Sequence, residues 1–240
     1  MKAGLAVTEL ACLVLHSAEG IEMGTELAWE YSTDNKQSKI IVVNMFDRGD
    51  YSQLVASLKD RFGRQIFPII SPIGKTDGTF TELSDVLRKE TLEFKTDGSG
   101  NYSGKECDET LKNELDSQHQ ELIELVAESD EELLEKFFEN GELTEEELRE
   151  GLKKAISNKA LIPVFCCDLK TNVGTKRLLD FISKYVPTAA EVNGFIAKDS
   201  SGNEIKVKPT DPMLSAYVFK TLSEEHVGEL SFFKVVSGKL

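Results

Sequence analysis

The sequence predicts an α/β protein: a mainly parallel sheet interrupted by an inserted α+β segment and followed by a β module. Four short apolar runs show no alternation, as expected for strands buried on both faces of a parallel sheet. Between the third and fourth runs, a turn-rich segment and a strongly acidic helical segment break the pattern. Beyond Pro187, polar turns and strand-like stretches replace it.

The first part of the chain alternates between helix and strand patterns. The expected elements, in order, are the end of a helix at 1–8, a buried strand at 9–15, a helix at 24–32, a strand at 40–43, a helix at 51–62 that Gly63 ends, and a strand at 66–70. The apolar run at 10–15 is far too short to span a bilayer. We therefore expect a cytoplasmic protein with no membrane partner.

An insertion is expected next. Short strands between 79 and 102 flank an Asp-Gly-Ser-Gly turn at 97–100, which predicts a hairpin. Residues 108–150 then hold 17 acidic and 3 basic residues, while the remaining 25 acids and 25 bases cancel. Apolar residues at helical spacing predict three helices there. Asn140-Gly141 should end the second helix, and Thr144 with Glu147 forms a capping box for the third.

The acidic segment has two interpretations. Composition alone favours a solvated face that only keeps the protein soluble. The sharper alternative is a docking surface for a basic or helical protein partner, with Glu121, Glu124 and Glu128 on one helix face. This face would repel a phosphate backbone, so DNA is not an expected partner.

The α/β pattern returns after the insertion. We expect a buried strand at 161–166 and an amphipathic helix at 175–185. A turn at 199–203 and two strand-like stretches at 217–219 and 230–236, joined through Gly228, follow. Two strands do not make an independent domain, so the chain is expected to start inside an α/β domain and stop inside a β domain.

Asn44 and Asp47 are the candidate site residues. They follow the strand at 40–43, at the carboxyl end where parallel sheets bind ligands. A carboxylate accepts two N–H groups from a guanine edge, a pair that adenine does not present. Taken alone, Asn-x-x-Asp after a strand is a weak signal and is more often a loop cap.

Other chemistry is not evident. The phosphate-binding pattern G-x-x-x-x-G-K-[ST] is missing: residues 74–76 read Gly-Lys-Thr, but Ile69 stands where the first glycine belongs. No strand-terminal Asp-x-x-Gly precedes it, so we expect no catalytic and no metal-binding residues. The three histidines are scattered. The four cysteines form no C-x-x-C pattern and are expected to be reduced, buried thiols: Cys12, Cys107, Cys166 and Cys167.

Five stretches resemble, in order and spacing, bacterial elongation factor G: VVNMFDR at 42–48, PIG at 72–74, LTEEE at 143–147, CCDLKTNVG at 166–174, and residues 211–238. The resemblance covers essentially the whole chain. It implies a fragment of a translational GTPase that begins after the family's Asp-x-x-Gly switch segment. The implied parts are a partial P-loop GTPase core (1–79), an inserted acidic subdomain (80–157), the end of the G domain (158–190), and a linker with the first strands of an antiparallel β-barrel (191–240).

The resemblance also implies roles. Asn44 and Asp47 occupy the Asn and Asp places of the family's Asn-Lys-x-Asp motif, where Asp reads guanine and Asn ties neighbouring loops together. Met45 replaces the lysine that covers the base and braces the phosphate loop. Asp168-Leu169 replaces the usual Ser-Ala, although a backbone N–H toward the guanine oxygen survives such a change. GTP or GDP, with Mg²⁺, is implied for the intact parent, with weak or absent binding in this fragment.

The family works on the ribosome, and its insert contacts the ribosomal stalk protein. Three hypotheses follow from the resemblance. The chain is a truncated translational GTPase without activity of its own, a module that docks a ribosomal partner through the acidic insert, or a degenerate paralogue that acts as a ribosome-bound scaffold without hydrolysis.

Overall fold

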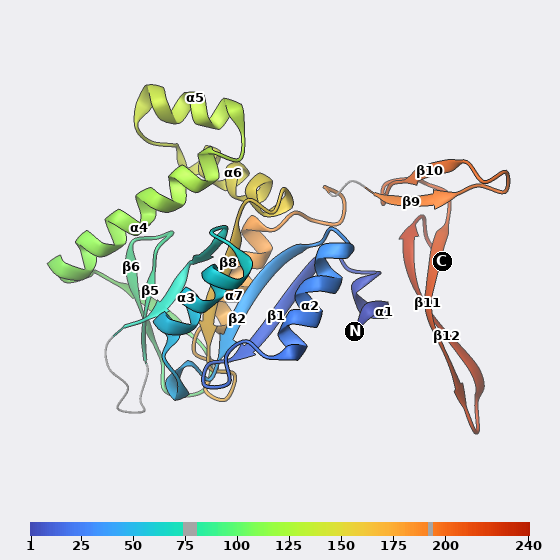
Figure 1. The fold of residues 1–240 in the computed structure, drawn as a ribbon, viewed down its shortest axis with the longest axis horizontal. Coiled ribbons are helices and arrows are strands. Elements are labelled where there is room, and N and C mark those ends of the chain that lie inside the picture. Colours follow the sequence, from blue (N-terminus) through green and yellow to red (C-terminus); the bar gives the residue numbers. More distant parts are fainter. Residues whose placement is uncertain (74–80, 192–193) are drawn as a thin grey trace. The chain divides into compact units, whose positions relative to one another are not determined.

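The computed structural model describes residues 1–73, 81–191 and 194–240 (Figure 1). The described chain divides into two compact units. The larger comprises Cys12–Glu30 and Ser38–Val186, and the smaller comprises Met1–Ala11, Tyr31–Gln37 and Pro187–Leu240. The Gly-Lys-Thr sequence at 74–76 and the expected boundary near residue 79 lie outside the described residues.

A four-stranded sheet forms the centre of the larger unit, in the order β1-β2-β8-β3. Its central strand β8 pairs in parallel with β2 on one side and β3 on the other. Helices α2 and α3 lie in front of this sheet in Figure 1, and α7 lies behind it. Three of the predicted strands and the first part of the fourth, which was expected at 66–70, therefore share one mainly parallel sheet. The elements are β1 (Leu10–His16), α2 (Met23–Asp34), β2 (Ser38–Asn44), α3 (Tyr51–Phe62), β3 (Ile66–Pro68), β8 (Ile162–Cys167) and α7 (Thr175–Tyr185).

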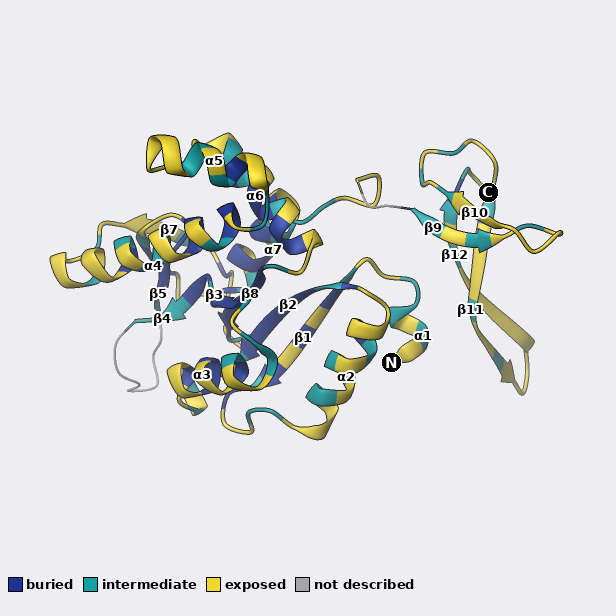
Figure 2. Cartoon of the chain, turned by 45° about the horizontal axis from the view of Figure 1, so that its top comes forward, coloured by how far each residue is buried: buried dark blue, intermediate teal, exposed yellow. Residues whose placement is uncertain are grey.

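Burial follows the apolar runs in the central strands. Residues 40–43 are no more than 2% exposed, and every residue of β8 is buried (Figure 2). The edge strand β1 instead alternates, with Cys12 and Val14 exposed, the latter at 58%. The expectation of a strand buried throughout at 9–15 is thus wrong for one face, because that face of β1 is open to solvent.

The expected strand at 66–70 divides between two sheets at Ile69. Its N–H donates to the carbonyl of Val164 in β8 at 2.9 Å, and its own carbonyl accepts the N–H of Val86 at 3.0 Å. β3 ends just before this residue, and β4 (Ile70–Pro72) begins just after it. β4 opens a second, antiparallel sheet in the order β4-β5-β6-β7, which contains the predicted hairpin. The new strands are β5 (Glu82–Asp85), β6 (Glu90–Phe94) and β7 (Tyr102–Lys105).

The acidic segment forms three helices, as predicted: α4 (Glu109–Ala127), α5 (Glu131–Asn140) and α6 (Glu145–Ser157). Each begins at a side chain that accepts a hydrogen bond from the N–H three residues later. Thr144 and Glu147 form the expected capping box, and Gly141 ends α5 at a φ of 75°. Among the helices described, none combines the length and apolar character needed to cross a membrane.

The smaller unit contains α1 (Lys2–Leu5) and two hairpins. β11 (Ser215–Glu224) pairs antiparallel with β12 (Gly228–Ser237), so the two strand-like stretches are longer than predicted and adjoin each other. β9 (Phe195–Lys198) and β10 (Glu204–Val207) pair on either side of the predicted turn at 199–203. The sequence did not predict this further hairpin. Within this unit, the ammonium of Lys234 donates to the carbonyl of Val7 at 2.8 Å and pairs with Glu9.

Candidate functional site

Three loops meet at the carboxyl ends of β1, β2 and β8. The register of the parallel pair places Asn44, the last residue of β2, beside Cys167, the last residue of β8. The loop after β2 therefore lies next to the loop that begins at Asp168. Both predicted parts of the site, Asn44 to Asp47 and Asp168-Leu169, reach this one edge of the sheet because parallel strands end on the same side.

Asn44 joins these loops directly. Its side-chain oxygen Oδ1 accepts the backbone N–H of Leu169 at 3.2 Å. Its main-chain carbonyl accepts the N–H of Ser17 at 3.1 Å, and the Ser17 hydroxyl donates to the carbonyl of Met45. Ser17 was missed by the sequence reasoning, because a serine after a strand carries no signal that distinguishes it from an ordinary loop residue. The amide of Asn44 thus fixes the relative position of the two loops.

The backbone after Asn44 turns sharply. Met45 adopts a left-handed conformation at a φ of 53°, and its carbonyl accepts the N–H of Arg48 at 2.9 Å. This forms the short helix η1 (Phe46–Arg48), with the Phe46 ring buried in the core. A Cβ at Gly49 would stand 2.5 Å from the Ser17 carbonyl oxygen, so glycine allows these loops to touch. The turn places Met45 and Asp47 on a tightly held loop.

Asp47 has an available carboxylate. The residue is half-buried within η1. Within the described ranges, no hydrogen bond or ion pair engages its side chain. A half-buried carboxylate without an internal partner is an acceptor ready for donors of a ligand.

The carboxylate of Asp168 is, in contrast, used by its own loop. Oδ1 accepts the N–H of Lys170 at 3.0 Å, and Oδ2 accepts the hydroxyl of Thr171 at 2.6 Å. The Asp168 N–H donates to the carbonyl of Val173 at 2.9 Å, which closes the loop. Its negative charge is therefore partly compensated by local donors, and the group of this loop that faces Asn44 is the N–H of Leu169.

The close return of this loop depends on Gly174. It adopts a φ of 80°, and a Cβ there would stand 2.3 Å from the carbonyl oxygen of Cys166. Any other residue would meet both backbone strain and a collision with β8. Gly174 therefore fixes the path of the chain from the loop into α7.

The cysteines at this edge are inert. Burial raises the pKa of Cys167 to about 12, and burial also holds the pKa of Cys166 well above its ordinary value. Cys12 is exposed and Cys107 is half-buried, so the expectation of four buried thiols is wrong for these two. Cys12 lies on the open face of β1, which explains its exposure. Among the residues that the structure covers, no cluster of three potential metal ligands is present.

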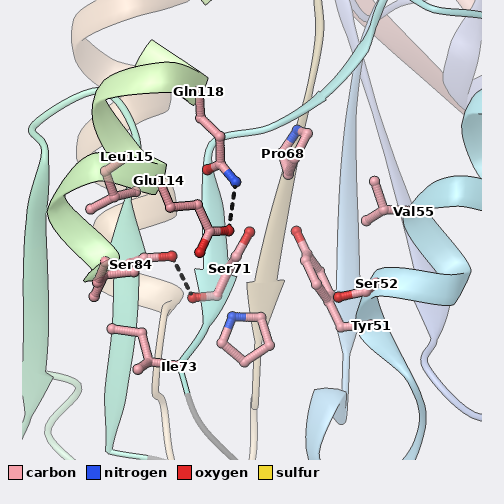
Figure 3. A pocket seen from close by; sticks show the side chains of 12 residues that line it. Tyr51, Ser52, Val55, Pro68, Ser71, Ile73, Ser84, Glu114, Leu115 and Gln118 are labelled. Atoms are coloured by element: carbon pink, nitrogen blue, oxygen red, sulfur yellow. Dashed lines mark hydrogen bonds between the residues drawn. The ribbon is translucent and has the colours of Figure 1, made fainter.

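A cavity of about 380 Å³ lies elsewhere in the larger unit, between α3, α4 and strands β3 to β5 (Figure 3). The hydroxyl of Tyr51 donates to the Ile70 carbonyl at 2.8 Å, and Ser84 donates to the carbonyl of Ser71. On α4, the side-chain amide of Gln118 donates to the carboxylate of Glu114 at 3.0 Å. None of the predicted base-reading residues lines this cavity, so it is separate from the site at the sheet edge.

The site combines the amide of Asn44 at the end of β2 and the available carboxylate of Asp47 on the loop after it with the backbone N–H of Leu169 on the loop after β8. The carboxylate offers two acceptor oxygens, which suits recognition of a planar heterocycle with adjacent N–H groups.

Comparison with known proteins agrees with this architecture. The sequence profile described as "Elongation factor Tu GTP binding domain" matches residues 1–188. A crystal structure of a protein from Thermus thermophilus superposes with a TM-score of 0.83 at 26% sequence identity, covering 100% of this chain and 33% of that one. The chain thus spans about a third of the length of this similar protein. Because the profile matches most of the sequence, the chain belongs to the elongation factor Tu GTP-binding domain family of translational GTPases.

Proposed function

We propose that this chain supplies the guanine-recognising part of a translational GTPase of the elongation factor G type. The observation that carries the proposal is the bond from the Leu169 N–H to Asn44 Oδ1, beside the available carboxylate of Asp47. In this proposal residues 1–79 and 158–190 belong to the G domain, 80–157 to its insert, and 191–240 lead into a β-barrel.

Each residue has a role in base recognition. The Asp47 carboxylate accepts the two neighbouring N–H groups of a guanine edge, and Asn44 holds the loop whose backbone faces the guanine oxygen. Met45 contributes only its apolar side chain where a lysine would brace a phosphate loop. The parent protein would use GTP or GDP with Mg²⁺, whereas the residues described here engage only the base.

Ligand-observed NMR with guanosine monophosphate tests this proposal. We expect weak, guanine-selective binding of order millimolar, about −4 kcal/mol, with adenosine monophosphate as the negative comparison. The Asp47→Asn variant should no longer bind guanosine monophosphate and should bind xanthosine monophosphate instead. The reason is that an amide N–H can donate to the extra oxygen that xanthine presents. Asp60→Asn, the same charge change on the exposed surface of α3, is the matched control. If wild type and Asp47→Asn bound the guanosine, adenosine and xanthosine monophosphates alike, base reading would be refuted.

We also propose that the protein works in the cytoplasm on the ribosome, with the acidic helices contacting the stalk protein. Of the three acids on the α4 face, Glu121 approaches Lys59 at 3.9 Å and Glu128 approaches Arg64 at 3.8 Å. These bases of α3 and the loop after it partly neutralise that face. The outer face of α5 carries Glu135, Glu139 and the adjoining Glu142 around Phe138, which is 77% exposed. This face is therefore the stronger candidate for a basic partner.

Two charge reversals separate these surfaces. The first changes Glu135, Glu139 and Glu142 to Lys, and the second changes Glu121, Glu124 and Glu128 to Lys. Stalk-protein binding, measured by fluorescence anisotropy at several salt concentrations, should fall more in the first variant and lose its salt dependence there. Unchanged binding in both variants would mean that the acidic surface is only solvated charge.

A ribosome-bound scaffold that does not hydrolyse GTP is the second candidate, favoured by Met45 in the lysine position. Sequencing the encoding gene upstream of Met1 distinguishes the two. A phosphate-binding loop there supports a GTPase parent, whereas its absence supports the scaffold.

A further inference from the structure

The turn between β6 and β7 lies against the loop that holds Leu169. The side-chain amide of Asn172 donates to the carbonyl of Gly98 at 2.8 Å, and the ammonium of Lys176 donates to Asn101 Oδ1 at 2.9 Å. These partners are 74 and 75 positions apart in the sequence. The turn belongs to the inserted antiparallel sheet, whereas the loop follows the central strand of the parallel sheet.

Two glycines of this turn differ in how closely they approach the loop. Gly100 is buried, and a Cβ there would stand 2.8 Å from the carbonyl oxygen of Asn172. Gly98 is exposed, and a Cβ there would meet nothing within 4 Å. Both adopt left-handed backbone, with φ of 68° and 74°. The backbone of the turn is thus pressed onto the loop at Gly100.

Two further hydrogen bonds join the antiparallel sheet that carries the turn to helix α7. The Tyr102 hydroxyl donates to Asp180 on α7 at 2.9 Å, and Arg177 on the same helix donates to Asp85 of β5 at 2.6 Å. The inserted sheet is therefore bound to the helix that leaves the loop. It is well placed to set the loop's position, because the exposed loop is otherwise held mainly by bonds within itself.

We propose that the turn at 97–101 is a positioning element of the base-recognition site. By pressing on Asn172, it keeps the 168–174 loop in the shape in which the Leu169 N–H meets Asn44. Asn172 is a positioning residue in this scheme, since it acts through the loop and not on a ligand. The coupling to guanine recognition rests on the proposed function, whereas the hold on the loop does not.

Amide hydrogen exchange in the full chain tests the hold. In Gly100→Ala the new methyl group should push the turn away from Asn172, and the amides of Asp168 and Leu169 should exchange about tenfold faster, as expected for loss of one or two hydrogen bonds. Gly98→Ala is the matched control, because it introduces the same left-handed strain without a collision, and should leave both amides near the wild-type rate. Amides of β2 report global stability.

The Asn172→Asp variant tests the same contact between the turn and the loop by changing the loop's side chain. Aspartate tolerates the left-handed backbone of Asn172, at a φ of 62°, but replaces the donor with an acceptor that faces the Gly98 carbonyl. It should accelerate the same two amides by a similar factor. Equal exchange of these amides in Gly100→Ala and Gly98→Ala, or acceleration that β2 shares equally, would overturn the proposal.

Binding of guanosine monophosphate, measured by ligand-observed NMR, adds the functional arm. Gly100→Ala should weaken binding several-fold relative to Gly98→Ala. If wild-type protein binds no guanosine monophosphate, the base-reading function fails, and the exchange rates still decide whether the turn positions the loop.

Discussion

Arg177 on α7 and Asp85 at the end of β5 form a buried ion pair, with a distance of 2.6 Å from Nε to Oδ2. The two side chains are 1% and 0% exposed. The other carboxylate oxygen accepts the N–H groups of Leu87 and Arg88 at 3.0 and 3.1 Å. Arg177 Nη2, in contrast, has no partner among the residues described. The pair therefore joins the antiparallel sheet to α7, with the carboxylate better satisfied than the guanidinium.

Removing one member of this pair should destabilise the protein strongly. Asp85→Ala leaves the guanidinium of Arg177 buried and unpaired, and we expect a loss of about 3–5 kcal/mol in the free energy of unfolding by urea. Lys105→Ala, which breaks the exposed pair with Glu82 in the same sheet, should cost far less, because solvent screens that pair. The double change Asp85→Leu with Arg177→Met should recover most of the stability. Equal losses in the two single variants would contradict this account.

Gly174→Ala should be far more damaging than Gly141→Ala. Both glycines are left-handed, at φ of 80° and 75°, so both changes cost about 1 kcal/mol of backbone strain. Only at Gly174 does the new Cβ also collide with β8, at the carbonyl oxygen of Cys166. We expect a melting temperature clearly below that of Gly141→Ala by calorimetry. Similar melting temperatures would mean that the loop relaxes freely.

This chain should neither hydrolyse GTP nor bind it tightly. Base recognition alone supplies only part of the free energy of nucleotide binding. This sequence contains no matching phosphate-binding loop that would supply the rest. Titration calorimetry with GTP and GDP should give dissociation constants weaker than micromolar, which corresponds to about −8 kcal/mol. Tighter binding, or phosphate release above the rate of buffer alone, would refute this expectation.

Thiol chemistry should separate the four cysteines. Iodoacetamide reacts with thiolates, and burial suppresses ionisation of Cys166 and Cys167 by raising their pKa values. Burial also raises the pKa of Cys12, so native protein at pH 8 should be modified at Cys107 first and at Cys12 more slowly, as read by peptide mass spectrometry. Cys166 and Cys167 should react only after denaturation. Early labelling of Cys166 or Cys167 would show that the end of β8 opens readily.

The raised pKa of Cys167 also predicts alkaline sensitivity. The folded group holds its proton up to about pH 12, whereas an unfolded cysteine releases it near pH 9. Its contribution to stability is therefore complete below pH 9 and declines as the pH rises toward 12. Cys167→Ala should flatten this part of the curve of unfolding free energy against pH. An unchanged slope would assign the alkaline loss to other groups.

The sequence predicts those parts of the fold that depend on local patterns. Unbroken apolar runs identify β2 and β8, and capping residues identify the ends of the acidic helices. The division of one apolar run at Ile69 could not be predicted, because it depends on hydrogen bonds to Val164 and Val86 from distant strands. The hairpin of β9 and β10 was missed because its strands are largely exposed and lack a clear apolar face.

The candidate site shows the same limit. Asn44 and Asp47 follow a recognisable strand, and the structure places Leu169 beside Asn44 as the loop pattern implies. Ser17 and Asn172 depend on contacts between segments far apart in the sequence, which a single sequence does not reveal. The internal use of the Asp168 carboxylate was equally hidden, since the same residue in an open loop would face solvent.

The shared peptide at Ile69 has a consequence for how this protein unfolds. Its N–H belongs to the parallel sheet and its carbonyl to the antiparallel one, so neither sheet can lose its edge without disturbing the other. Excising residues 80–157 would remove Val86 and leave the Ile69 carbonyl without its backbone partner. The two sheets should therefore unfold in one cooperative transition. A mechanical force applied to the antiparallel sheet would be transmitted through Ile69 to β8, the strand that precedes the 168–174 loop of the site.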